Sequence, residues 1–487
     1  MAAWLVVCAG HLAQAHALES EAPRVIARLQ SLIPELMHEG EVPGLAIALV
    51  QDGEGVWSAG FGVKNAKTRE RVDDDTVFEA ASLGKPVFAY AVFKLVDAGK
   101  LDIDKPLCRY WPAGCDAGAD PRMSQVTARH VLSHTTGLPN WRNGALEIHF
   151  TPGERFSYSG EGYVFLSRAV EHIAGEPINE LMTRTVFVPL GMKSSSYVWR
   201  PAYDETKTSY HNTRGEPAAR RPPAEPQPTN VAAGLHTTAH DYGLFVQAML
   251  KGTGLKRKTR RLMLTPQVQV REGGATTIEH PDARPFPGVE WGLGWGLQTT
   301  ASGLSFFHWG NNGDAKAYVV ASDTQKQAVV VFANSVYGMS IVPEIVAQSI
   351  GGEQPALAWL RVESYRSTGR TLFKNLVARG APAALAEYRE WRESHPTEAP
   401  VNEDQMNRFG LDLLRMGRAQ DAIPVLKQNV ADHPQSFNVY DSLAEAYAAA
   451  GERELAIENY ERSIEINPAN KGGIEALRTL RERKQAD

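Results

Sequence analysis

Short apolar runs bounded by turn residues occur near both ends of the region before residue 350. Residues 43–51 and 56–62 form one pair, joined by the Asp-Gly-Glu-Gly turn at 52–55. A similar group follows far along the chain, at 304–308, 317–321 and 328–333. Runs of this length between turns predict strands, and the chain between the two groups favours helices and loops. We therefore expect one antiparallel sheet built from both ends, with a helical lobe inserted between them.

An internal repeat sets the last part of the chain apart. Residues recur at an offset of 34: Gly417 as Gly451, Ala422 as Ala456, Ile423 as Ile457 and Pro434 as Pro468. A turn glycine, small residues at helix crossings and a terminal proline at this period resemble the tetratricopeptide repeat. We expect an all-α, tetratricopeptide-like domain over 402–487, preceded by a charged helical connector over 351–401.

The charge balance bears on the kind of partner this chain can bind. Its 487 residues carry a formal net charge of −5 without a basic cluster, and the length allows two or three domains. Nucleic acid and anionic membrane surfaces are therefore poor candidates as partners.

The first 17 residues are typical of an export signal. A short apolar stretch leads to Ala13-Gln14-Ala15 and Ala15-His16-Ala17, which are small-x-small patterns of the kind that signal peptidase cleaves. No Lys or Arg precedes Arg24, so a buried helix, or a start further upstream, stays open as an alternative. We expect an exported, periplasmic protein, with the cytoplasm as the alternative location.

The cysteines bear on the same question. Cleavage of the leader would remove Cys8 and leave Cys108 and Cys115, which flank a turn-rich stretch. In an oxidising compartment these two residues can pair. Two free thiols in a cytosolic protein are the alternative, because the sequence does not give the distance between them.

The segment Ser82-Leu83-Gly84-Lys85 stands at the head of an apolar run at 87–96 that predicts a buried helix. Residues three apart lie on one helical face, so the Ser82 hydroxyl and the Lys85 amine can meet. A serine becomes nucleophilic when an adjacent unprotonated amine can take its proton. The alternative is a helix-capping serine beside a solvated lysine, and only further motifs can decide between the two.

Six segments resemble, in order, the motifs of the class C β-lactamase-related serine hydrolases, a family that includes D,D-peptidases, D-aminopeptidases and carboxylesterases. The matching segments are 76–86, 128–138, 152–160, 188–193, 232–241 and 308–310. Their shared order makes the resemblance more specific than any single motif. It covers residues 25–350 and implies an α/β, β-lactamase/transpeptidase-like fold, in which an antiparallel sheet is flanked by helices and joined to a helical lobe.

The resemblance implies a role for each matching residue. Ser82 would be the acyl-accepting nucleophile, and Lys85 together with the phenol of Tyr158 would act as its general base. His308 would bind a substrate carboxylate or the tyrosine, with a charge that depends on pH. The backbone amides of Ser82 and Asn311 would form the oxyanion hole. Two further substrate-binding residues would be Trp309 and Gly310.

One position departs from the family pattern. The second motif usually reads Tyr–x–Asn, whereas Gly160 takes the third place after Tyr158 in this chain. In the family this Asn helps to bind the amide side chain of β-lactams and peptides. Its absence weakens the case for efficient β-lactam hydrolysis and leaves the tyrosine in place.

Other candidate sites are weaker. His130 and His134 have the i, i+4 spacing of zinc ligands on one helix, but no Glu stands beside the first His as it does in zinc peptidases. We expect this pair to be structural, and we expect neither a metal nor an organic cofactor at the site. The tryptophan-rich stretch at 291–295 favours a packed strand, which can also wall the cleft.

These patterns predict a serine hydrolase that cleaves an ester, amide or peptide bond in a small molecule through an acyl-enzyme. A β-lactamase proper is one alternative. The other is an interaction protein, in which the repeat domain binds a partner protein and the hydrolase fold is a scaffold. A scaffold would need none of Ser82, Lys85 and Tyr158. With about two repeats only, the array is expected to pack on the catalytic domain.

Overall fold

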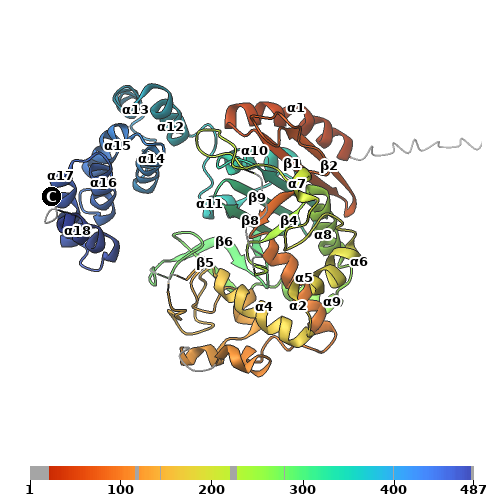
Figure 1. Ribbon diagram of the computed structural model, residues 1–487. Coiled ribbons are helices and arrows are strands. Elements are labelled where there is room, and N and C mark those ends of the chain that lie inside the picture. Colours follow the sequence, from red (N-terminus) through yellow and green to blue (C-terminus); the bar gives the residue numbers. More distant parts are fainter. Residues whose placement is uncertain are drawn as a thin grey trace, which may run out of the picture.

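The computed structural model describes residues 21–115, 120–142, 144–219, 228–278, 280–398 and 400–483. A large domain built around an eight-stranded sheet is followed by a group of helices that projects from one side of it (Figure 1). The leader expected at 1–17, with Cys8, lies outside the described residues. Within the described ranges, no helix combines the length and the apolar character needed to cross a membrane.

All neighbouring strands of the large sheet run antiparallel, in the order β2-β1-β10-β9-β8-β7-β6-β5. The strands are β1 (Gly44–Gln51), β2 (Glu54–Gly62), β5 (Val268–Arg271), β6 (Pro285–Trp291), β7 (Gly296–Thr300), β8 (Gly303–Asn312), β9 (Ala315–Ser322) and β10 (Gln327–Ala333). The register of β1 on β10 joins Leu45 to Ala333 and Val50 to Ala328. The predicted sheet, built from both ends of the domain, is confirmed.

The central strands are apolar throughout because both of their faces are covered. In β10, Ala328, Val330 and Phe332 belong to the core on the side of the helical lobe, whereas Val329 and Val331 belong to the core on the opposite side. This alternation is the period of two that a strand imposes on its side chains. The sheet therefore separates two hydrophobic cores.

Helices cover both faces of the sheet (Figure 1). One face is covered by α1 (Ala22–Gly40), α10 (Val342–Ser349) and α11 (Pro355–Trp359), and the other by α8 (Ala239–Lys251). The inserted lobe also contains α2 (Gly84–Asp97), α3 (Ala128–Leu132), α4 (Gly160–Ala174), α5 (Ile178–Met182), α6 (Val188–Leu190), α7 (Tyr203–Thr206) and α9 (Arg257–Met263). A small sheet of β3 (Phe78–Ala81) and β4 (Leu235–Thr237) contacts β8 and β9, and so joins the lobe to the large sheet.

The sequence did not predict the three strands β5, β6 and β7 at one edge of the sheet. Pro285, Pro287 and Gly288 weaken the strand pattern of β6. They precede Val289–Trp291, the part of β6 that pairs with β7, so these residues interrupt no ladder with that strand. The stretch at 291–295 was expected to be a packed strand. It is instead the tight connection from the end of β6 to the start of β7, with Trp291 and Trp295 fully buried.

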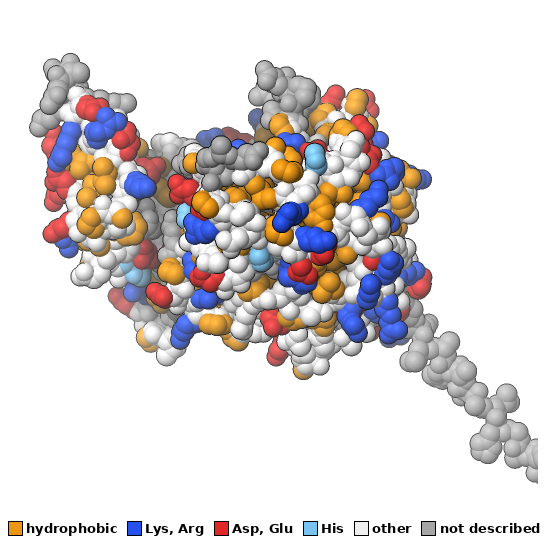
Figure 2. Space-filling view, turned by 90° about the horizontal axis from the view of Figure 1, so that it is seen from below, with side chains coloured by type: hydrophobic (Ala, Val, Ile, Leu, Met, Phe, Trp, Pro, Cys, Tyr) orange, Lys and Arg blue, Asp and Glu red, His pale blue; other side chains and the backbone are white. Residues whose placement is uncertain are grey.

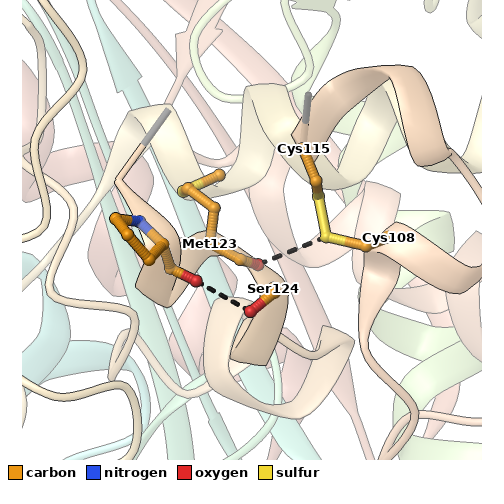
Figure 3. The surroundings of a disulfide bond; sticks show 5 residues. Cys108, Cys115, Met123 and Ser124 are labelled. Atoms are coloured by element: carbon orange, nitrogen blue, oxygen red, sulfur yellow. Dashed lines mark hydrogen bonds between the residues drawn. A yellow bond between two sulfur atoms is a disulfide. The ribbon is translucent and has the colours of Figure 1, made fainter. Parts of the chain in front are cut away.

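Cys108 and Cys115 form a disulfide across the turn-rich stretch between them (Figure 3). Their Cα atoms lie 5.8 Å apart. The sulfur of Cys108 lies 3.4 Å from the carbonyl oxygen of Met123, which belongs to a neighbouring short helix. Of the two alternatives that the sequence left open, the structure has the paired cysteines.

The C-terminal helices form successive antiparallel hairpins. They are α12 (Thr368–Arg379), α13 (Ala381–Ser394), α14 (Glu403–Arg415), α15 (Ala419–Asp432), α16 (Phe437–Ala449), α17 (Arg453–Ile466) and α18 (Lys471–Arg483). Gly417 and Gly451 turn the hairpins α14–α15 and α16–α17 with φ angles of 74° and 82°, a conformation that glycine adopts readily. The 34-residue repeat is therefore a repeat of helical hairpins. One hydrophobic cluster runs from Leu372 in α12 to Ala456 in α17, so α12 and α13 pack as part of the same unit.

Helix α12 holds this helical unit against the large domain. Arg370 is buried, forms an ion pair with Glu41, and lies with its guanidinium carbon 3.2 Å from the ring centre of Tyr337. Lys374 of the same helix donates a hydrogen bond to the carbonyl oxygen of Glu39. A guanidinium that is both paired and stacked fixes the geometry of a contact. The helical unit therefore contacts the large domain through α12, which lies in the expected connector and not in the repeats at 402–487.

Candidate active site

Ser82 lies at a sharp turn between a strand and a helix. Strand β3 ends at Ala81, whose φ of 48° falls in the left-handed region that residues other than glycine rarely adopt. Helix α2 then begins at Gly84, and Ser82 itself is half-buried. Backbone strain of this kind persists only where the surroundings hold it, and it clusters at functional sites.

Lys85, in the first turn of α2, is completely buried. Its Nζ donates hydrogen bonds to Ser82 Oγ at 3.1 Å and to the carbonyl oxygen of Ala232 at 2.8 Å. Burial lowers the pKa of the Lys85 amine well below its ordinary value. A neutral amine at this distance can accept the proton of the serine hydroxyl.

Tyr158 reaches the site from the segment that precedes α4. The centre of its ring lies 4.7 Å from Lys85 Nζ. Burial raises the pKa of the phenol above its ordinary value, and a polar contact with the Ser82 side chain offsets part of that rise. The phenol is therefore protonated, and its hydroxyl has no hydrogen bond of standard geometry within the described part of the chain. The structure thus brings Ser82, Lys85 and Tyr158 together.

His134 supports Tyr158, a contact that the sequence did not predict. Its ring stacks on the tyrosine ring with the two centres 4.1 Å apart, and its Nδ1 accepts a hydrogen bond from the Ser159 amide at 3.0 Å. Burial lowers the pKa of His134 well below its ordinary value, so the ring is neutral. Its place in the Ser-His-Thr-Thr-Gly segment of the family motifs was the one available signal.

His130 caps helix α3 and, unlike His134, is not stacked on Tyr158. Helix α3 ends at Leu132, so the two histidines do not share a helical face as their spacing suggested. The His130 ring accepts a hydrogen bond from the Thr127 amide at 3.4 Å, as part of the box that caps α3. No cluster of three or more potential ligands that could hold a metal occurs among the residues that the structure describes.

His308 lies on β8 and is completely buried. Its ring centre is 6.0 Å from that of Tyr158, and its Nδ1 hydrogen bonds with the carbonyl oxygen of Trp309 at 2.8 Å. Burial, assisted by the nearby Lys85, lowers the pKa of His308 to about 3. The sequence led us to expect a charge that changes with pH. Such a low pKa keeps the imidazole neutral under ordinary conditions.

Strand β8 also brings Trp309, Gly310 and Asn311 to the site. A Cβ on Gly310 would lie 2.4 Å from the carbonyl oxygen of Ala80, so only glycine allows β8 to approach β3 this closely. That approach carries the backbone of Asn311 toward the turn at Ser82. The Trp309 ring packs against the Tyr158 ring, with the ring centres 4.9 Å apart.

The chain can be compared with known proteins on this basis. The family model described as "Beta-lactamase" matches residues 29–346. The chain belongs to the beta-lactamase family. Members of this family are serine hydrolases, and the strand–Ser82–helix turn with its buried lysine lies within the matched region.

Relatives in the beta-lactamase family carry several activities in their names. The chain is 26% identical over 235 residues to "Esterase EstB" of Burkholderia gladioli, a match that covers 42% of this chain and 59% of the relative. It is 27% identical over 315 residues to "Penicillin-binding protein 4" of Amycolatopsis lactamdurans, covering 60% of this chain and 81% of the relative. The chain spans 59% and 64% of the length of two relatives, this esterase and "Protein flp" of Staphylococcus aureus.

Solved structures of family members show the same fold. A mutant class C beta-lactamase aligns with a TM-score of 0.57 at 18% identity, covering 68% of this chain and 98% of the other. The D-alanine carboxypeptidase AmpC from Burkholderia cenocepacia aligns with a TM-score of 0.56 at 19% identity, covering 68% and 99%. The predicted β-lactamase/transpeptidase-like fold is confirmed.

The C-terminal helices have a match of their own. The family model described as "Bacterial transcriptional activator domain" matches residues 368–486, from the start of α12 onward. This helical region is tetratricopeptide-like, as the 34-residue repeat indicated.

Proposed function

We propose that this protein cleaves an ester or amide bond through a Ser82 acyl-enzyme, as an esterase, amidase or peptidase. The observation that carries the proposal is the 3.1 Å hydrogen bond between Ser82 Oγ and the Nζ of the fully buried Lys85. A buried amine with a lowered pKa destabilises the folded protein, and a scaffold has no use for one. A nucleophile that must lose its proton does need such a neighbour.

In the acylation step, Ser82 Oγ attacks the carbonyl carbon of the substrate and its proton passes to Lys85 Nζ. The carbonyl electron pair moves onto the oxygen, where the backbone amides of Ser82 and Asn311 would donate hydrogen bonds to it. When the bond to the leaving group breaks, the leaving group takes the proton from Lys85, directly or through Tyr158.

Deacylation repeats these steps with water as the nucleophile. Water attacks the acyl carbon, gives a proton to Lys85, and the bond to Ser82 Oγ breaks as the serine takes that proton back. Because burial favours a neutral Lys85 and a protonated Tyr158, we assign proton acceptance to the lysine and proton relay to the tyrosine. The chemistry needs neither a metal nor an organic cofactor.

The substrate is proposed to be a small ester, amide or peptide rather than a β-lactam. Similarity to a named esterase and to a penicillin-binding protein supports this class. Gly160, in place of the family's Asn, argues against a β-lactamase proper, which is kept as the alternative. The likeness to a class C beta-lactamase, at 18% identity, speaks for the fold and not for the substrate.

We propose further that the C-terminal helices contact a protein rather than nucleic acid. A match to part of a transcriptional activator supports a role in macromolecular contact. The formal net charge is −5, and side chains of both signs are mixed across the face seen in Figure 2. Binding to phosphates would instead favour a continuous basic surface. A scaffold that only binds a partner remains the rival interpretation of the whole protein.

Export is proposed from the disulfide together with the leader pattern. Structural disulfides persist in oxidising compartments and are rare in the cytosol. The pairing of Cys108 with Cys115 therefore supports a periplasmic location. Thiol alkylation of whole cells, followed by fractionation, tests this. Two alkylated cysteines in a cytosolic fraction would contradict it.

Ser82→Ala tests the proposed function directly. The variant should lose at least about 10³-fold in the rate of p-nitrophenyl butyrate hydrolysis, because removing the nucleophile removes the covalent route. The exposed Ser302 offers a matched control, since Ser302→Ala should hydrolyse the ester at the rate of the unaltered protein. A folded Ser82→Ala variant that keeps most of the activity would show that another group is the nucleophile.

A further inference from the structure

A loop closes the position where the family motif has Asn. Gly160 is the first residue of α4. A Cβ built on Gly160 would lie 2.7 Å from the carbonyl oxygen of Asn140 and 2.8 and 2.9 Å from two ring atoms of Trp141. Carbon atoms do not approach this closely without displacing a neighbour. The space that a side chain at position 160 would enter is therefore occupied by the Trp141 ring.

The start of α4 anchors this loop. The Asn140 carbonyl oxygen accepts hydrogen bonds from the amides of Gly160 and Glu161, each at 3.1 Å, and Asn140 Oδ1 accepts from Gly160 at 3.0 Å. On the other side of Trp141, the Arg142 amide donates to Glu161 Oε1 at 3.2 Å. Amides at a helix start need such acceptors. Trp141 is thus held between two anchored residues.

The Trp141 ring lies beside the catalytic amine. Lys85 Nζ is 6.0 Å from the ring centre and also hydrogen bonds to Ser82 Oγ. Trp141 is nevertheless 47% exposed, which makes it one of the large hydrophobic residues left at the surface. A fixed, half-open indole next to the nucleophile offers apolar surface to a group bound at Ser82.

We propose that Trp141 is a specificity-determining wall for the acyl group, so that the protein prefers esters of plain aliphatic acids to esters with an amide beside the acyl carbonyl. This inference rests on the proposed hydrolase and narrows its substrate class. An amide pressed against indole loses its water without gaining a hydrogen bond. An alkyl chain at the same place gains free energy by burial.

Asn140, rather than Trp141, is the alternative residue that would set the preference for the acyl group. Its oxygens both accept hydrogen bonds from the start of α4, whereas its side-chain NH₂ donates none within the described residues. That NH₂ could donate to a substrate amide in place of the missing Asn. Asn140→Asp keeps the accepting oxygen and removes this donor, so it separates the two interpretations.

The test compares two uncharged esters of similar length, p-nitrophenyl pentanoate and p-nitrophenyl N-acetylglycinate. Each kcat/KM is divided by the rate at which hydroxide hydrolyses the same ester, because the amide activates the carbonyl. The unaltered protein should prefer the pentanoate by about tenfold or more, the scale at which apolar pockets discriminate. Equal values for the two esters would overturn the inference.

Trp141→Ala should lower this preference by about tenfold, and Trp141→Phe, which keeps a ring, should retain most of it. Asn140→Asp should keep the original preference, since both esters are uncharged.

A folded Trp141→Ala variant with the original preference would overturn the inference, as would a preference that changes in Asn140→Asp alone. Folding is checked by thermal melting of each variant. Failure of the hydrolase proposal looks different, because the unaltered protein would then hydrolyse neither ester and Ser82 would take up no fluorophosphonate.

Discussion

At the scale of single residues, burial keeps the groups around Ser82 uncharged. It lowers the pKa of Lys85 and of His308, and it raises the pKa of Tyr158. Each shift favours the neutral form of its group. In the proposed acylation, charge would therefore develop on the substrate oxygen and on Lys85 in a site that starts without charge.

Lys85→Met measures how much the burial of a neutral lysine destabilises the folded protein. Between the lowered folded-state pKa and the ordinary value of 10.5, folding must strip a proton from Lys85. The unaltered protein therefore gains stability as pH rises toward 10.5, and methionine removes the dependence. We expect an inactive variant that melts higher at pH 7, with a difference that shrinks as pH rises. Calorimetry at several pH values measures this, and a variant that melts lower at pH 7 would count against a neutral lysine.

Residue-level prediction worked where local geometry fixed the contact. Ser82 and Lys85 meet because they are three residues apart at a helix start. The stack of His134 on Tyr158 and the approach of Trp141 to Lys85 could not be predicted in this way. These contacts depend on how separate loops pack, and the spacing of residues within one segment does not reveal that packing.

At the scale of elements, the site depends on how closely β8 approaches β3. Gly310 contacts Ala80 where a methyl group would not fit, and Asn311 follows directly on β8. In the proposed oxyanion hole, a displacement of β8 would therefore change the position of the Asn311 amide relative to Ser82. Hydrogen-bond donors to an oxyanion act only at the right distance.

Gly310→Ala should reduce ester hydrolysis by about 10²-fold or more, the scale of losing one oxyanion donor. The protein should still fold, because the strand remains paired with β9. Gly472→Ala is the matched control, since its Cβ would meet no atom closer than 3.6 Å. Measurement of kcat/KM for both variants decides the matter, and undiminished activity in Gly310→Ala would argue against the role given to β8.

Strands could be predicted from the sequence where their apolar pattern was strong. The apolar runs of β1 and β10 left little choice, because each is buried on both faces. Strand β6 begins Pro-Phe-Pro-Gly, which is typical of a loop, and its pairing with β5 and β7 is what makes it a strand. Tertiary pairing overrode the local signal there.

At the scale of the whole molecule, the helical unit and the large domain are joined through α12. The cluster shared by α12 to α17 includes the pair Phe373 and Phe409, whose ring centres lie 5.1 Å apart. The contact with the large domain comes from α12, in the expected connector, and the sequence predicted the repeat itself. It did not show that α12 and α13 share the core of the repeats, because these two helices do not carry the 34-residue pattern.

A chain ending at residue 400 should therefore be less stable than a chain ending at residue 366. The first cut separates Phe373 from Phe409 and exposes apolar surface, whereas the second removes the helical unit as a whole. We expect the longer chain to aggregate or melt earlier, with its soluble fraction still acylated at Ser82. Light scattering and thermal melting compare the two. A stable, monodisperse chain ending at 400 would show that the repeats are an independent module.

We infer that Ser82 forms a covalent acyl-enzyme with the help of Lys85. The most direct measurement treats the full chain with a fluorophosphonate and identifies the modified peptide by mass spectrometry. We expect one adduct on Ser82, formed faster as pH rises through the lowered pKa of Lys85 and absent in Lys85→Met. An unmodified Ser82 in the folded protein, or equal labelling in Lys85→Met, would contradict it.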